Sequence, residues 1–329
     1  MKDSSSKWKD FLLKSSVPLE YEVKRLLDNY GCLSTFEYTY LRKDENQILN
    51  EFSYDIDASF IKGAHFFELM IECKYRDPST NWIFTPENYE GFQEVKPYSF
   101  INPVDAFTDF HKFRDLDYEP LAPLCGKGIE ITSDGQNPKT ISQAIYQLSY
   151  AMAEKVVIGM EHQYEKLLGN IDMVFYPTPI IVTTANLFRL KENVTIEDIK
   201  KSKSIDEIST KEDCLILNNN IGKSLEDFNL KIFDDFISKY GRENLNKKLK
   251  SFNKDIEFVC SVFAKNYCPS AIAIIHFSEL NTGFEKLFNF FEEVIKPSER
   301  ILKKLEEKNN KLKEMSEKFE ALKQNKNKA

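Results

Sequence analysis

The sequence predicts a mixed α/β protein, because segments with a helical hydrophobic period alternate with segments that have the period of a strand. From Pro18 to Gly31, apolar side chains recur every three or four residues, and Gly31 stands where a helix cap is expected. Residues 36–42 and 52–60 alternate apolar and polar side chains, as half-buried strands do. Further buried strands are predicted at three short apolar runs, 179–188, 214–218 and 271–277.

Two longer segments complete the predicted domain. A third strand is predicted at 67–74, after a short turn that contains Gly63, and a long helix is predicted from Thr140 to about Leu168. Between them, residues 76–138 have no clean period but many aromatic side chains, so we interpret them as an ordered aromatic-rich insertion. The insertion is expected to cover the sheet as a hydrophobic cluster, and the alternative is a surface that stacks unpaired bases.

The composition excludes several classes of protein. The 329 residues are 42% hydrophobic and 13% aromatic, which excludes an intrinsically disordered chain. The formal net charge of -7 argues against binding nucleic acid through bulk positive charge. No apolar run is long enough to cross a membrane and the amino terminus has no signal-peptide pattern, so we expect a cytoplasmic protein without a membrane partner. The six cysteines form no CxxC pair, so neither a disulfide framework nor a zinc site is predicted.

The chain divides into residues 1–292, the predicted α/β domain, and residues 293–329, a Lys- and Glu-rich extension. Apolar residues in the extension follow the spacing of an amphipathic helix. Two interpretations remain open for this helix, docking on its own domain and formation of a coiled-coil homodimer. Within the domain, the sequence motifs lie at 14–75, the insertion at about 76–138, and the long helix with the remaining strands at 140–292.

The residues that indicate chemistry lie on two neighbouring strands. If 52–60 and 67–74 form a hairpin that closes around residues 63–65, Asp57 lies directly opposite Glu72. Facing carboxylates repel each other, and a hard divalent cation such as Mg²⁺ resolves that repulsion. Lys74, two residues beyond Glu72 on the same face, would then stand beside the metal and act on an attacking water. Asp55 lies on the same face of the strand as Asp57. It therefore remains an alternative to Asp57, and we interpret it as a candidate outer-shell ligand of the metal.

These residues resemble the motif of the PD-(D/E)XK nuclease superfamily, in particular its Mrr-like restriction-endonuclease branch. The family carries a Glu on a helix, then an Asp and a (D/E)-x-K on strands. Here the helix offers Glu20, with Glu22 as a less well spaced competitor, and the strands offer Asp57 and Glu72-Cys73-Lys74. The motif proline is absent, since Ile56 precedes Asp57. The resemblance implies a restriction-endonuclease-like mixed β-sheet core flanked by helices.

The resemblance also implies roles for individual residues. Glu20, Asp57, Glu72 and the backbone carbonyl of Cys73 would ligate Mg²⁺, with Mn²⁺ as a substitute, and Lys74 would act on the water. The cysteine thiol itself is expected to point into the core. The helix that bears Gln143 and Gln147 resembles the Gln-bearing helix that follows the motif, although its distance from Lys74 is longer than in compact members. These two residues and Arg76 are predicted to contact nucleic acid.

The function predicted on this basis is metal-dependent hydrolysis of nucleic-acid phosphodiester bonds, in the first place by a DNA endonuclease of restriction or defence type. A partner protein that supplies targeting is a further expectation, because the chain has little excess positive charge. The alternative is a catalytically silent nuclease-like scaffold that binds nucleic acid or a partner protein.

Overall fold

The structure is a computed structural model that describes residues 7–43, 48–87, 100–108, 121–167, 169, 172–250, 255–303, 306, 307, 310 and 314. Its centre is one mixed sheet in the order β1-β2-β3-β7-β11-β10-β5-β4-β8-β9, with β6 paired to β5. The strands are β1 (Leu33–Lys43), β2 (Leu49–Lys62), β3 (His65–Lys74), β4 (Asn81–Pro86), β5 (Leu124–Thr132), β6 (Gly135–Asn137), β7 (Val174–Thr183), β8 (Asn186–Leu190), β9 (Ser209–Glu212), β10 (Cys214–Asn218) and β11 (Ala271–His276).

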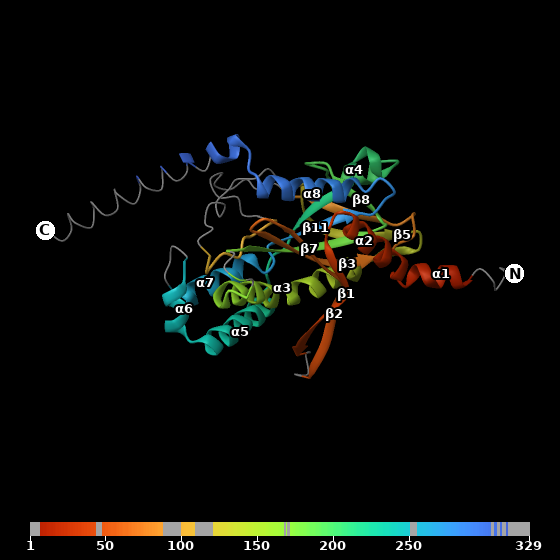
Figure 1. The fold of residues 1–329 in the computed structure, drawn as a ribbon. Coiled ribbons are helices and arrows are strands. Elements are labelled where there is room, and N and C mark those ends of the chain that lie inside the picture. The colour runs from red at the N-terminus through yellow and green to blue at the C-terminus, as the bar shows by residue number, and fades with distance from the viewer. Residues whose placement is uncertain are drawn as a thin grey trace.

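Helices cover both faces of this sheet (Figure 1). They are α1 (Lys7–Lys14), α2 (Val17–Asn29), α3 (Lys139–Glu165), α4 (Ile196–Lys201), α5 (Lys223–Tyr240), α6 (Arg242–Lys248), α7 (Ile256–Val262) and α8 (Thr282–Ile295). Side chains of α3, α5, α6 and α7 pack into one hydrophobic core, and those of α2 and α8 pack into a second core on the opposite face. The predicted mixed α/β class is therefore confirmed.

The segment that carries the motif folds in the predicted order of one helix and three strands. α2 buries Leu19, Val23 and Leu27 at helical spacing, and Gly31 follows it with a φ of 81°. β1, β2 and β3 are consecutive antiparallel strands, after which β3 pairs in parallel with β7. A parallel pair requires a crossover, and α3 lies in the connection between β3 and β7.

The aromatic-rich segment differs from the predicted insertion. Its residues 81–86 and 124–132 form β4 and β5, which are strands of the main sheet. Trp82 and Phe84 are fully buried in the main core, because β4 lies between β5 and β8. The expected hydrophobic role is thus confirmed for these two rings. Base stacking by Tyr89, Phe92, Tyr98, Phe110, Phe113 or Tyr118 concerns residues outside the described part.

Two other boundaries also differ from the sequence prediction. The run 179–188 does not form one strand, because the chain bends after Thr183 and continues as β8. The division at residue 293 falls inside α8, which packs Phe284, Leu287 and Phe291 against the sheet. Most of the predicted extension, and with it the proposed dimer helix, lies outside the described residues, although Ile301 is buried.

Candidate functional site

Carboxyl groups from three elements converge near the carboxyl end of β3. Glu20 lies in the first turn of α2, Asp55 on β2 and Glu72 on β3. Burial and then the nearby Asp55 raise the pKa of Glu72 to about 8, although Lys74 acts in the opposite direction. Burial and then Asp55 raise the pKa of Glu20 to about 7. Each group therefore resists ionisation because it is removed from water and faces other acids.

The register of the hairpin corrects the predicted pairing of Asp57 with Glu72. Lys62 pairs with His65, so the turn contains only Gly63 and Ala64, and Asp57 pairs with Met70. Gly63 has a φ of 60°, which suits the first central position of a two-residue hairpin turn. The predicted pairing of Asp57 with Glu72 therefore lies two positions along β3 from the observed pairing of Asp57 with Met70. The paired register ends with Ile56 opposite Ile71. One residue further along, Asp55 lies opposite Glu72.

Asp55 is fixed beside the E-x-K segment by a direct contact. Its Oδ2 accepts a hydrogen bond of 2.6 Å from the backbone N–H of Cys73. Burial raises the pKa of Asp55, although this hydrogen bond and Lys74 act in the opposite direction. Asp55 thus occupies the position that the sequence analysis assigned to Asp57.

Asp57 belongs to a different cluster. Its carboxylate forms an ion pair of 2.8 Å with Lys155 of α3 and accepts a hydrogen bond of 2.6 Å from the Tyr54 hydroxyl. Lys155 is buried, lies 4.0 Å from Glu68 and also stands 4.0 Å from the centre of the Tyr38 ring. Asp57 therefore already has a buried cation as its partner, which does not favour a metal-ligand role for it.

Lys74 links β3 to α3. Its ammonium group forms an ion pair with Glu72 and lies 3.4 Å from the amide oxygen of Gln147. The Gln147 amide nitrogen donates to the backbone oxygen of Ser53 at 3.2 Å, so this side chain spans β2 and β3. The structure thus brings Gln147 to the site, despite the long interval in sequence. Gln143 lies one turn earlier on α3 and is exposed.

The remaining predicted residues have distinct surroundings. The Cys73 side chain is buried in the second core, as expected, and burial raises its pKa well above the usual range. Glu22 is exposed, whereas Glu20 is partly buried and interacts electrostatically with Asp55 and Lys74. The Arg76 guanidinium contacts Glu130, Thr140 and the Tyr75 carbonyl. These contacts do not favour the predicted role of Arg76 in nucleic-acid binding.

Two charged residues that interact with the predicted site residues were missed in the sequence. Glu37 on β1 lies between Phe36 and Tyr38, which pair with Ile56 and Tyr54, so it stands across from Asp55. Its φ of 58° is unusual for a residue other than glycine, and its carboxylate raises the pKa of Glu20 and Asp55. The other residue is Lys155, which lies far along the chain. Alternation on β1 indicates a strand but not which polar residue approaches a distant acid.

The donor chemistry of the site fits a hard divalent cation. Glu20, Asp55 and Glu72 present three carboxyl groups to one ammonium, that of Lys74. Glu72 is 0% exposed, and its Oε2 has no hydrogen-bond partner among the residues that the structure describes. An unpaired carboxylate oxygen in such a site is a natural ligand for Mg²⁺. In the side-chain positions of the described residues, however, no three His, Cys, Asp or Glu groups already form a metal-binding cluster.

Fold and site together define an α/β protein with an acidic cluster and one lysine at the end of a central strand. No family model, curated protein or solved structure matches the chain. Within the described ranges, none of the helices combines the length and apolar character that spanning a membrane requires.

The buried carboxyl group of Glu68 predicts a pH dependence of stability. Burial raises its pKa to about 7 in the folded protein from 4.5, and Lys155 only partly opposes this shift. The folded state therefore holds the proton more tightly than the unfolded state, so the contribution of Glu68 to stability is lost as the pH rises from 4.5 to 7. Urea unfolding in EDTA should show that Glu68→Gln flattens the fall in unfolding free energy over this range.

The control for this experiment is Glu161→Gln, which removes the ion pair of 2.8 Å between Glu161 and Lys239 at a partly exposed position. This variant should retain the wild-type dependence on pH. An equal slope in wild type and Glu68→Gln would show that Glu68 is ionised in the folded protein throughout the range.

Proposed function

We propose that the protein is a metal-dependent nuclease that hydrolyses phosphodiester bonds of DNA. The observation that carries the proposal is the electrostatic interaction of Glu20, Asp55 and Glu72 with Lys74, together with a buried Glu72 oxygen that has no hydrogen-bond partner among the described residues. The order of a helix with Glu, strands with Asp and E-x-K, and a helix with Gln supports it, because the resembled superfamily carries its motif in this order. The proposal replaces Asp57 by Asp55 as the motif aspartate.

Each of these residues then has a chemical role. Glu20, Asp55 and Glu72 would hold Mg²⁺ or Mn²⁺, together with the Cys73 carbonyl that the resemblance implies. When bound, such an ion acts as a Lewis acid toward a phosphodiester oxygen. Lys74 places a positive charge where negative charge develops on the phosphate during attack by water. Gln147 holds the Lys74 ammonium in position through its amide oxygen.

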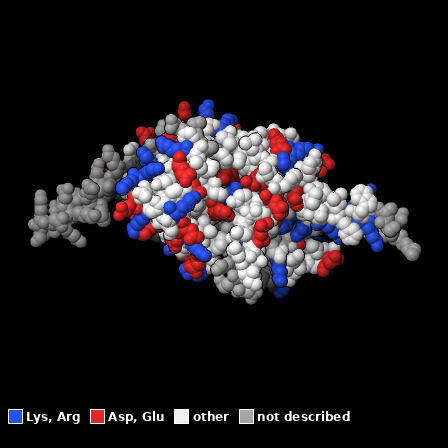
Figure 2. Space-filling view, turned by 60° about the horizontal axis from the view of Figure 1, so that its bottom comes forward, with Lys and Arg blue, Asp and Glu red and all other residues white. Residues whose placement is uncertain are grey.

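We expect the nucleic acid to be bound by a small number of local basic side chains. On the face shown in Figure 2, basic and acidic side chains are interspersed and neither sign forms a continuous band. A phosphate backbone would therefore meet only a few cations there, and binding is expected to depend less steeply on salt than in strongly basic proteins. This distribution agrees with the proposal that a partner protein assists in targeting.

The proposal is tested by incubating the purified chain with supercoiled plasmid, linear duplex and single-stranded DNA in Mg²⁺, Mn²⁺ or EDTA. We expect cleavage in either metal and none in EDTA, and Lys74→Met should remove it because the charge beside the phosphate is lost. Cleavage that persists in EDTA or in Lys74→Met would contradict the proposed site. The substitution removes a group that is only partly buried, so the variant is expected to remain folded.

A catalytically silent scaffold is the second candidate, and one observation favours it. The acids of the described residues do not already form a metal-binding cluster, so the site requires side-chain movement before it can hold an ion. Thermal unfolding in Mn²⁺ distinguishes the two candidates, because an ion that binds only the folded state raises the melting temperature. A rise that disappears in Glu72→Gln supports the nuclease, and no rise in wild type supports the scaffold.

A further inference from the structure

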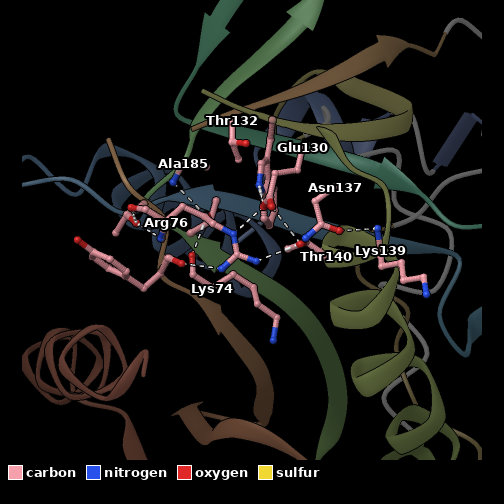
Figure 3. Close-up of polar contacts among 12 residues, drawn as sticks. Lys74, Arg76, Glu130, Thr132, Asn137, Lys139, Thr140 and Ala185 are labelled. Atoms are coloured by element: carbon pink, nitrogen blue, oxygen red, sulfur yellow. Dashed lines mark hydrogen bonds and ion pairs between the residues drawn. The ribbon is translucent and has the colours of Figure 1, made fainter. Parts of the chain in front are cut away.

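Arg76 lies two residues beyond Lys74, and its side chain turns back into the protein (Figure 3). Its Nε donates to Glu130 of β5 at 2.6 Å, and a terminal nitrogen donates to the Thr140 hydroxyl at 3.1 Å. The second terminal nitrogen donates to the backbone oxygen of Tyr75 at 2.6 Å. The guanidinium therefore connects the end of β3 with β5 and with the first turn of α3.

The Glu130 carboxylate is the centre of this arrangement. Its side chain is 3% exposed, whereas that of Arg76 is 25% exposed. Besides Arg76, it accepts hydrogen bonds from Trp82 Nε1 at 2.8 Å and from the Thr140 hydroxyl at 3.1 Å. A buried carboxylate with several fixed donors is rigid, because each lost contact would leave a charge unpaired away from water.

Backbone contacts fix the end of β3 from the other side. The Thr184 hydroxyl hydrogen-bonds with both the backbone nitrogen and the backbone oxygen of Arg76, each at 2.7 Å. The Thr183 hydroxyl donates to the Lys74 backbone oxygen at 2.8 Å. The main chain from Lys74 to Arg76 is thus held by the residues at the end of β7, and the Arg76 side chain connects it to Thr140 of α3.

The contacts of α3 with Arg76 and with Lys74 come from one side of the helix. Thr140 and Gln147 are seven residues apart, which is about two helical turns, so they lie on the same side of α3. One of them contacts Arg76 and the other lies 3.4 Å from Lys74. The Asn137 side chain also accepts from the backbone nitrogen of Lys139, which fixes the first residue of the helix.

We propose that Arg76, Glu130 and Thr140 form a clamp, the Arg76 clamp, that positions Lys74 against Gln147 for the nuclease reaction. Arg76 is on this view a positioning residue and not a ligand of the nucleic acid. The inference rests on the proposed function for its catalytic consequence. The geometry of Lys74 is a separate consequence that can be measured without catalysis.

The kinetic test compares Arg76→Lys and Thr140→Val with wild type. Both variants should lower kcat by about 10- to 100-fold, because small displacements of positioned groups have effects of this size. KM and its dependence on salt should remain those of wild type, since no phosphate contact is lost. Thr140→Ser keeps the hydroxyl and should restore kcat. The matched control is Arg189→Lys, in which an arginine that is 18% exposed contacts a backbone oxygen elsewhere.

The second readout is the rate at which acetic anhydride acetylates Lys74, followed by mass spectrometry of peptides. Loss of the clamp should raise this rate several-fold in Thr140→Val and not in Arg189→Lys or Thr140→Ser. If wild type does not cleave DNA, the proposed function fails and this rate alone decides whether the clamp exists. An unchanged rate in Thr140→Val overturns the inference. An Arg76→Lys variant with raised KM, a weaker salt dependence and unchanged kcat would make Arg76 a phosphate ligand and overturn it as well.

Discussion

Asp55→Asn is expected to abolish DNA cleavage, whereas Asp57→Asn retains most of it. The two residues lie on the same strand and differ in their partners. Asp55 accepts from the Cys73 backbone and raises the pKa of Glu20 and Glu72, while Asp57 is paired with Lys155. Loss of Asp55 should lower the cleavage rate by at least about 100-fold, or about 2.7 kcal/mol of transition-state stabilisation.

The measurement is the rate of plasmid cleavage in Mg²⁺ at saturating DNA for both asparagine variants. Asparagine preserves the size of the side chain, so the comparison isolates the charge at each position. Circular dichroism of each variant controls for folding. If Asp55→Asn were active and Asp57→Asn inactive, Asp57 would be the motif aspartate, as the sequence predicted.

The sequence was sufficient to predict the elements that carry the motif, because their signals are local. Helical spacing around Leu19 and Val23 predicted α2, alternation predicted β1 and β2, and β3 was predicted after the turn that contains Gly63. The face shared by Glu72 and Lys74 also follows from alternation alone, since residues two apart on a strand point the same way. Glu20, Glu72, Lys74 and Gln147 accordingly lie near one another in the structure.

The register of the hairpin could not be predicted from these local signals. Gly63 is compatible with hairpin turns of different length, and a shift of two positions along β3 decides whether Asp55 or Asp57 faces Glu72. Both carboxylates are on the same predicted face, so the hydrophobic pattern does not distinguish the two registers. The residue that faces Glu72 is determined by how the turn fits the twist of the two strands.

Long-range partners were the other part that the sequence did not reveal. Arg76 pairs with Glu130 and Asp57 pairs with Lys155, which are separated by 54 and 98 residues. Such pairs depend on how β5 and α3 pack on the sheet, and no periodicity within one segment indicates them. A basic residue beside the motif was therefore interpreted as a ligand of nucleic acid, although its charge is used within the fold.

Lys155→Met is expected to destabilise the protein by about 3–5 kcal/mol, because it leaves the partly buried Asp57 and the buried Glu68 without their cation. The Lys155 side chain is 6% exposed and contacts Asp57, Glu68 and the Tyr38 ring. Methionine fills a similar volume, so the loss reports on charge more than on packing. Equilibrium unfolding in urea at pH 7 measures the difference.

Two comparisons separate this effect from a general effect of removing a lysine. Lys62→Met breaks the exposed ion pair between Lys62 and Glu292 and should cost only about 0–1 kcal/mol. Lys155→Met combined with Glu68→Gln removes a buried acid together with the cation, so it should be more stable than Lys155→Met alone. If Lys155→Met were no more destabilising than Lys62→Met, Asp57 would not depend on Lys155 for its charge balance. The argument that Asp57 is committed to the fold, and Asp55 to the candidate metal site, would then lose its energetic basis.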